Sequence, residues 1–375
     1  MMAEHRIVLV GGGHSHVQVL RAFARQPEPL ARLTLVSDSL EAPYSGMLPG
    51  HVAGLYSREA MHIDLAALAA RCGADVVPQA AVGIDRPGRK VVLADGTHLP
   101  YDTLSLNIGI TPNLSSVTGA DRFALALKPI GRLLAKLEGA LGSGPPAKAP
   151  GRILVVGGGP AGVEVALALR ARLSGSEHRS RPWIGIAAGR GLVPRLNPRA
   201  RGKLARVLVR KDIEVLPSCR IAEVAADGAR AEDGRWIAAD LTIMATAARG
   251  QPWLAGTDLS LSPDGSVLVR PTLASTGDDA VFATGDCAEL VGQPLDKAGV
   301  YAVRQGPVLA ENLRRRIRGE PLMAYRPQAR TLAILSTGDG RAVASWGDRF
   351  AVEGRWVWWW KDWIDRRFVE GFSSP

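Results

Sequence analysis

The sequence predicts an α/β protein with two nested Rossmann-like dinucleotide-binding domains and a small C-terminal α+β domain. Two segments, residues 7–17 and 153–164, carry most of this prediction, because each runs from an apolar strand through a glycine turn into a helix. Such a segment is typical of a fold that holds a dinucleotide pyrophosphate at a helix N-terminus. The third observation is a tail that holds six of the nine tryptophans, all after residue 345. A chain with two such folds most simply binds two dinucleotides.

The first glycine turn follows the predicted strand 7–10 and leads into a helix. Its residues are Gly11, Gly12, Gly13, His14, Ser15 and His16. Glycines at the first positions let backbone amides approach a pyrophosphate, whereas His16 replaces the usual third glycine and predicts a looser approach of helix to strand. The next strand, 33–36, is followed by Asp38, whose carboxylate suits ribose hydroxyls. We expect no metal site here, because no cysteine or carboxylate accompanies the two histidines.

The second glycine turn is complete and follows a linker rich in glycine, proline and alanine at 142–150. Its key residues are Gly157, Gly159, Pro160, Ala161, Gly162 and Glu164. An amphipathic helix is predicted from this turn through Leu173. The strand 183–186 that comes next is followed by Arg190 rather than by a carboxylate. Arg190 would suit the 2′-phosphate of NADPH, or it is simply a surface residue of the turn.

Composition narrows the function classes. The chain has 375 residues, a net charge of +10 and three distant cysteines, which excludes a disulfide scaffold and a CxxC redox pair. Only six residues precede the first apolar strand, so we expect no secretion signal, and no apolar run is long enough to span a membrane. The basic cluster 314–318 has no nucleic-acid motif beside it and is interpreted as a helix end. These observations predict a cytoplasmic protein without a nucleic-acid partner.

Four further segments give the chain its resemblance to a family. Residues 281–288 look like a second FAD fingerprint, in which Asp286 would hold the ribityl chain. Residues 106–112 and 244–249 look like the paired crossings between an FAD domain and a nicotinamide domain, and 192–196 fits the nicotinamide domain. The chain thus resembles the two-dinucleotide flavoprotein disulfide reductase superfamily, and within it the members without a disulfide, such as type II NADH dehydrogenases.

The resemblance implies FAD and NAD(P)H as cofactors and a division into three parts. The FAD domain would comprise residues 1–115 and 250–322, the NAD(P) domain 116–249, and the C-terminal domain 323–375. The residues expected to contact FAD are Gly11, Gly12, Gly13, His14, Ser15, Asp38, Met47, Leu48, Val82, Gly109, Asp286, Lys297 and Ala298. Those expected to contact the nicotinamide nucleotide are Gly157, Gly159, Pro160, Ala161, Gly162, Glu164 and Arg190.

Two side chains are candidates for a catalytic role. In type II NADH dehydrogenases a glutamate at the position of Glu164 lies near the contact of nicotinamide and flavin, although here the carboxylate could simply complement a helix N-terminus. Lys297, with the helix that starts near Ala298, would direct positive charge at one edge of the flavin, or would merely cap that helix. Met47 and Leu48 would form an apolar cover over the flavin, or only a turn.

Two departures from the family limit what the resemblance implies. The segment 42–50, where disulfide reductases carry a redox cysteine pair, has no cysteine, so a thiol–disulfide relay is chemically excluded. The quinone-lining pattern of type II NADH dehydrogenases is also missing, because Gly299, Val300 and Arg304 stand at the matching positions and Gln305 is one step out of register. The usual quinone ligands are therefore not assigned.

The function that the resemblance implies is an NAD(P)H dehydrogenase that passes electrons through FAD to a quinone or a similar small acceptor. A closer likeness is to oxidoreductases fused to, or encoded beside, selenophosphate synthetase, carried by residues 11–17, 44–50, 297–306 and 361–368. Two alternatives stay open: a sulfide or selenide oxidoreductase, and an accessory flavoprotein that partners selenophosphate synthetase. The three cysteines lie outside the positions that a flavin-facing pair would need.

The tryptophan-rich tail, residues 355–368, has helical spacing after Gly354. Its predicted stripe contains Trp356, Trp360, Trp363, Ile364 and Arg367. Aromatic residues flanked by arginine and lysine suit a membrane interface, and in the resembling quinone reductases this segment meets the bilayer. The alternatives are a lid packed on the flavin and a homodimer contact. Peripheral attachment to the inner face of the cytoplasmic membrane is thus a further hypothesis.

Overall fold

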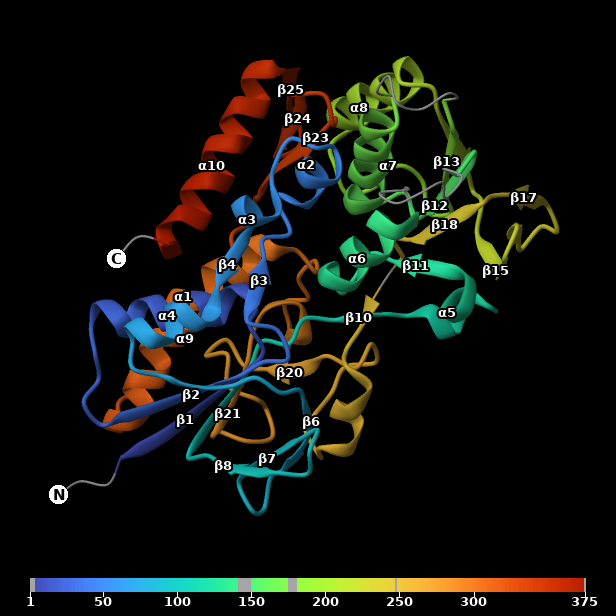
Figure 1. Ribbon diagram of the computed structural model, residues 1–375. Coiled ribbons are helices and arrows are strands. Elements are labelled where there is room, and N and C mark those ends of the chain that lie inside the picture. Colours follow the sequence, from blue (N-terminus) through green and yellow to red (C-terminus); the bar gives the residue numbers. More distant parts are fainter. Residues whose placement is uncertain (1–3, 141–149, 175–180, 247, 374–375) are drawn as a thin grey trace.

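The computed structural model describes residues 4–140, 150–174, 181–246 and 248–373. Its architecture is α/β, as predicted, with two five-stranded parallel sheets and a small C-terminal unit (Figure 1). Most of the linker at 142–150 lies outside the described residues. Among the helices of the described chain, none combines the length and the apolar character needed to cross a membrane.

The first parallel sheet contains the strand that precedes the first glycine turn. Its order is β21 (Val281–Ala283), β9 (Thr103–Leu106), β1 (His5–Val10), β2 (Ala31–Val36) and β5 (Asp75–Val77). Residues 7–10 of β1 are at most 3 % exposed, as expected for a central parallel strand buried on both faces. Figure 1 shows three helices together on one side of this sheet: α1 (His14–Arg25), α4 (Leu65–Arg71) and α9 (Gly299–Arg318).

The second parallel sheet repeats this arrangement around the second glycine turn. Its order is β11 (Ala124–Ala126), β18 (Leu241–Met244), β12 (Arg152–Val156), β13 (Trp183–Ala188) and β14 (Ile213–Pro217). The strand that leads into a glycine turn is therefore the middle strand of each sheet. The helices of this part are α5 (Ala120–Phe123), α6 (Ile130–Ala140), α7 (Pro160–Arg172) and α8 (Pro198–Arg210).

The chain crosses between the two sheets at a short antiparallel ribbon. Strand β10 (Thr111–Pro112) pairs with β19 (Ala248–Arg249), so the two crossings predicted from the sequence lie side by side. Small antiparallel sheets surround the two parallel ones. They are β6 (Ala81–Asp85), β7 (Lys90–Leu93) and β8 (His98–Pro100), then β15 (Ile221–Ala225), β16 (Gly228–Ala231) and β17 (Trp236–Ala238).

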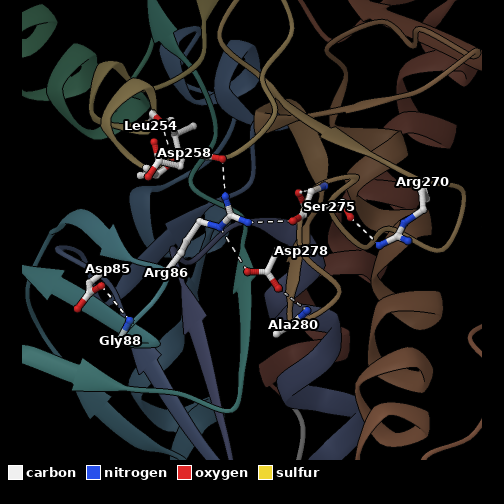
Figure 2. A network of polar contacts seen from close by, with 11 residues as sticks. Asp85, Arg86, Gly88, Leu254, Asp258, Arg270, Ser275, Asp278 and Ala280 are labelled. Atoms are coloured by element: carbon white, nitrogen blue, oxygen red, sulfur yellow. Dashed lines mark hydrogen bonds and ion pairs between the residues drawn. The ribbon is translucent and has the colours of Figure 1, made fainter.

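Shorter elements complete the part of the molecule that contains the first parallel sheet. This part is called the first half below, and the part that contains the second parallel sheet is called the second half. They are the antiparallel pair β3 (Glu41–Pro43) and β4 (His62–Asp64), helices α2 (Leu48–Val52) and α3 (Arg58–Met61), the parallel pair β20 (Val267–Val269) and β22 (Ala288–Leu290), and the 3-10 helices η1 (Leu114–Ser116), η2 (Pro252–Gly256) and η3 (Gly285–Cys287). Arg86 ties the end of β6 to this region, since it contacts Asp278 at 3.3 Å and donates to the carbonyls of Asp258 and Gly277 (Figure 2). Arg86 thus joins the two chain segments of the predicted FAD domain through hydrogen bonds and an ion pair.

The C-terminal part is a three-stranded antiparallel sheet followed by a long helix. Its elements are β23 (Leu332–Ser336), β24 (Ala342–Trp346), β25 (Phe350–Gly354) and α10 (Arg355–Ser373). Asn197, the N-cap of α8, donates to the carbonyls of Gly347 and Phe350 at 3.1 and 2.8 Å. The small sheet is therefore fastened to the second parallel unit, whereas α10 extends toward the first (Figure 1).

Candidate active site

The first glycine turn is built around Asn107, which follows β9. Gly11 has φ +92°, and a Cβ on it would lie 2.6 Å from the Asn107 carbonyl oxygen, so only glycine fits. The Asn107 side chain accepts from the Ser15 amide at 3.0 Å and donates to the Thr284 carbonyl at 2.8 Å. One asparagine therefore fixes the ends of three neighbouring strands relative to the turn. In the sequence, Asn107 stands out only as a member of the crossing segment 106–112.

His16 occupies the third glycine position as a buried, fully bonded side chain. Its Nδ1 lies 2.6 Å from the Gly11 carbonyl oxygen, and its Nε2 lies 2.8 Å from the Ser105 hydroxyl. Burial lowers the pKa of His16 to about 4, so the ring is neutral at pH 7. The imidazole fills the space between helix and strand, which explains the loss of glycine at this position. In the described chain no group of histidine, cysteine and acidic residues could hold a metal ion.

The residues around this turn fit a bound FAD. Helix α1 begins at His14, after an N-cap, Gly13, that has no side-chain bond. The Asn107 side chain accepts from the Ser15 and His16 amides, so the His14 amide is the one left at this helix N-terminus for a pyrophosphate. The Thr284 hydroxyl is buried without a hydrogen-bond partner in the described structure. Asp38 is exposed just past β2, and Gly109 has φ +67° just past β9. In parallel α/β sheets, ligands bind at these carboxyl ends of strands.

Asp286 and the start of α9 lie together beside this edge of the sheet. One narrow cavity is lined by Asp286, Lys297 and Ala298, among others. The Asp286 carboxylate pairs with Lys128 at 2.5 Å, and Lys128 precedes α6 in the second half of the molecule. Lys128 is a contact that sequence analysis missed, because nothing in its local pattern marks a partner 158 positions away.

The Lys297 ammonium is held within the protein. It donates to the Ser266 hydroxyl at 2.8 Å and to the Ala288 carbonyl at 3.2 Å. Ala298 is the N-cap of α9, as the predicted helix start requires. Gln305, on the next turns of α9, accepts from the Gly285 amide at 2.6 Å and is buried. Gln305 therefore holds the loop that carries Asp286, which accounts for its displacement from the quinone-lining register.

The second glycine turn has tight backbone geometry. Gly157 has φ +131°, and a Cβ on Gly162 would lie only 2.1 Å from the Gly157 carbonyl oxygen. Helix α7 begins at Pro160 with Gly159 as an uncapped N-cap, so its first amides are available for an anion. Ala161 is exposed in the first turn of α7, and Arg190 is exposed just past β13. This arrangement fits a nicotinamide nucleotide.

Glu164 lies one turn into α7, where three parts of the chain meet. Its Oε1 accepts from the Ser336 amide, at the end of β23, at 2.8 Å. Burial raises the pKa of Glu164 to about 7, and the nearby charge of Lys361 opposes that rise. Helix α2, which follows the buried Met47, packs against α7. The predicted flavin cover and the predicted catalytic carboxyl are therefore on adjacent helices.

Val82 and the cysteines complete the predicted positions. Val82 is 46 % exposed on β6, open to a ligand at the sheet edge. Cys219 and Cys287 are buried, Cys72 is half-buried, and all three are free. Burial raises the pKa of Cys287 to about 11, so it stays a thiol at neutral pH. These features exclude a paired redox disulfide among the three cysteines.

A model of the pyridine nucleotide-disulphide oxidoreductase family matches residues 5–312. The chain belongs to this family. It is an FAD-dependent oxidoreductase that acts with a pyridine nucleotide. The match spans both glycine turns, Asp286 and the start of α9, and so includes every predicted cofactor-binding residue.

Individual members of the family are similar over most of the chain. Ferroptosis suppressor protein 1 of Taeniopygia guttata is 26 % identical over 275 residues, which cover 70 % of this chain and 69 % of the relative. The structure of NDH2 from Plasmodium falciparum in complex with NADH has a TM-score of 0.81 at 14 % identity, covering 99 % of this chain and 98 % of that one. The sulfide:quinone oxidoreductase from Aquifex aeolicus has a TM-score of 0.79 at 18 % identity, covering 99 % and 93 %.

The predicted stripe of the tail helix is only partly exposed. Trp356 and Trp363 are 51 and 57 % exposed, whereas Trp360 is half-buried and packs against the core. The buried face instead carries Trp358, Lys361 and Asp365. The aromatic spacing gives no sign of this face, because Lys361 and Asp365 form a buried ion pair on it. Lys361 was not identified from the sequence as a site residue.

Proposed function

We propose that this oxidoreductase is an NAD(P)H dehydrogenase that delivers electrons through FAD to a quinone or a similar small acceptor. The observation that carries the proposal is the contact of α2 with α7. It brings Met47 and Leu48, the proposed cover of the first dinucleotide site, against the helix that follows the second glycine turn and carries Glu164. Two cofactors held by these sites would meet at this contact.

The residues have distinct proposed roles. The turn of residues 11–15 would hold the FAD pyrophosphate through the amides of Gly12 and His14, because the other three amides of the turn donate within the protein. Asp38 would bind the ribose, Val82 and Gly109 would flank the cofactor, and Asp286 would bind the ribityl chain. When bound, FAD accepts a hydride from the nicotinamide and releases electrons to the acceptor. Lys297 would place positive charge near the flavin edge. Its hydrogen bond to the Ser266 hydroxyl fixes the position of the ammonium group. Glu164 would hold or release one proton near neutral pH, since its pKa is about 7.

The nucleotide preference is part of the proposal. Gly157, Gly159, Pro160, Ala161 and Gly162 would bind the pyrophosphate of NADH or NADPH. Arg190 is exposed at the strand end where a 2′-phosphate would lie, and this supports acceptance of NADPH.

The deciding experiment separates electron donors from acceptors. The purified protein is reduced anaerobically with NADH or NADPH and is then reoxidised with quinones, oxygen and sulfide-derived acceptors. We expect complete flavin reduction by a pyridine nucleotide and reoxidation by a quinone within the turnover time. Reduction followed by reoxidation with none of the quinones would overturn the quinone assignment and leave the family assignment intact.

The sulfide or selenide alternative makes a separate prediction. Two of the three cysteines are buried and none is paired, which favours chemistry without cysteine. The Cys72→Ala, Cys219→Ala and Cys287→Ala proteins should each retain NAD(P)H oxidation. A variant that folds normally but has lost activity would support the sulfide or selenide alternative. Pull-down with a selenophosphate synthetase tests the accessory role, which predicts stable association together with slow turnover on every quinone.

Access to a quinone would come from a membrane surface. Trp356, Trp359 and Trp363 are exposed along one side of α10, with Arg366 and Arg367 beside them, and aromatic and basic residues together suit a lipid interface. We propose peripheral contact with the inner face of the cytoplasmic membrane through this side, in preference to a homodimer contact. We also propose the division into an FAD domain (1–115 and 250–322), an NAD(P) domain (116–249) and a C-terminal contact domain (323–375).

A further inference from the structure

Helix α10 buries a lysine and an aspartate one turn apart. The side chains of Lys361 and Asp365 are 8 and 5 % exposed, and their Nζ and Oδ2 atoms lie 2.5 Å apart. The Lys361 ammonium also donates to the Gly46 carbonyl at 2.6 Å. Charged side chains are almost never this buried unless they are paired, so the pair has a defined position within the fold.

Tyr44 holds the aspartate from the opposite side. Its hydroxyl donates to the Asp365 carboxylate. Its ring lies 4.6 Å from the ring of Phe368 and 5.4 Å from that of His14, measured between centroids. Tyr44 and Gly46 belong to the same short connection between β3 and α2, so two contacts from α10 fasten the segment that leads to the proposed flavin cover.

The charge of Lys361 also acts on the carboxyl of Glu164, which is bonded to the end of β23, a strand that packs against α10. The positive charge of Lys361 lowers the pKa of Glu164, and the negative charge of Asp365 raises it. Besides these three groups, the titratable groups that interact with the pair in the described chain are Tyr44, Tyr56 and Asp362. His14, which contacts Tyr44, has a pKa lowered by burial to about 4 and is neutral near pH 7.

We propose that Asp365 and Tyr44 are positioning residues that hold the Lys361 ammonium between the Gly46 carbonyl and the Glu164 carboxyl, so that α10 completes the reaction site. The inference rests on the proposed function of Glu164, but it concerns the chain's own residues. If the pair served only to attach α10, apolar residues could replace it with little loss in the free energy of unfolding. A hydrogen bond to the Gly46 carbonyl of one half, together with a charge that acts on the Glu164 carboxyl of the other, is what a positioning role requires.

The test uses opposite charge changes at the two ends of the pair. Asp365→Asn leaves the lysine charge unopposed and should lower the apparent pKa of Glu164, whereas Lys361→Met should raise it, each by about one pH unit. The readouts are the pH dependence of urea unfolding for the apoprotein and the pH dependence of anaerobic flavin reduction by NADH. The matched control is Asp75→Asn, which breaks an exposed ion pair with Arg32 between β5 and β2 and should leave both inflections unchanged.

A further pair of variants covers the case in which a single substitution prevents folding. The double variant Lys361→Met/Asp365→Asn removes the pair without leaving a buried charge, and it should fold while flavin reduction slows at least about tenfold. Tyr44→Phe should speed hydrogen exchange at the Met47 and Leu48 amides several-fold while the inflection stays in place. Both readouts precede acceptor reduction, so they remain informative if no quinone is a substrate. Shifts of the same sign in the single variants, or a double variant with the wild-type reduction rate, would overturn the proposal.

Discussion

Glu164 shows how burial changes the chemistry of one side chain. Its carboxyl accepts from the Ser336 amide, and Lys361 lies near enough to lower its pKa, yet burial outweighs both and holds the pKa at about 7. A carboxyl with an ordinary pKa of about 4.5 would be fully ionised at neutral pH. At the contact of two cofactor sites, a group that is half-protonated near pH 7 is suited to proton exchange.

This pKa predicts the pH dependence of stability. Between the unfolded value of 4.5 and the folded value of about 7, the folded state binds a proton that the unfolded state has released. The contribution of Glu164 to the free energy of unfolding is therefore fully present below pH 4.5 and is lost as the pH rises through 7, by at most about 3 kcal/mol. Urea unfolding at pH 5, 6, 7 and 8 should show this decline in the wild type, and Glu164→Gln should remove it. An unchanged slope in that variant would contradict the assignment.

His16 provides a second prediction for a single residue. His16→Gly restores the usual third glycine but leaves the Gly11 carbonyl and the Ser105 hydroxyl without the imidazole, so it should lower the free energy of unfolding by about 2–3 kcal/mol. Because the folded pKa of about 4 lies below the ordinary 6.5, the His16 contribution is present above pH 6.5 and is lost as the pH falls through 4. Chemical denaturation measures both effects, with the exposed His98→Ala as the control. A stabilised His16→Gly protein would show that the ring only replaces a missing glycine.

Helix α7 and the turn before it illustrate the element scale. Packing of the helix against its own strand depends on the absence of a side chain at Gly162, whereas Gly159 has open space around its Cα and an ordinary φ of −72°. The two glycines of one motif therefore serve different purposes: close packing within the protein, and approach of a ligand to the backbone.

Alanine substitutions should separate these purposes. Gly162→Ala should lower the melting temperature and weaken NADH binding, because the new Cβ would overlap the Gly157 carbonyl. Gly159→Ala should fold with wild-type stability, since no protein atom lies within 4 Å of its Cβ, but it should lose NADH affinity about tenfold or more. Calorimetry of unfolding and of NADH binding measures both quantities. Equal stabilities for the two variants would contradict the packing argument.

At the scale of the whole molecule, α10 joins the two cofactor-binding halves and leaves its other side exposed. Its buried face reaches Gly46 of the first half, and its own sheet contacts Glu164 and Asn197 of the second. The exposed tryptophans thus lie on a helix whose opposite side closes the proposed reaction site. A lipid surface bound there would lie on the outer side of the same helix.

Vesicle binding tests this orientation. Trp359→Ser/Trp363→Ser should reduce flotation with anionic vesicles several-fold and should leave the oxidation of NADH by a water-soluble acceptor unchanged. The matched control is Trp236→Ser, an exposed tryptophan on β17 of the second half, which should float like the wild type. Absence of vesicle binding by the wild type would leave a subunit contact as the role of the exposed face.

Sequence alone determined what depends on neighbouring residues. The two glycine turns, the strands before them, the helix after Gly354 and the lack of a dithiol follow from local spacing and residue type, and the fold class was confirmed. The pairing of Asp286 with Lys128, the bonds of His16 and the burial of Lys361 with Asp365 were decided by tertiary structure. The first two join residues from different elements, and the pair on α10 is buried by Gly46 and Tyr44 of another segment. From the sequence alone, a charged side chain in an amphipathic helix is expected to be exposed. Only the packed structure supplies those partners, because the free energy that keeps such charges buried comes from groups distant in the chain.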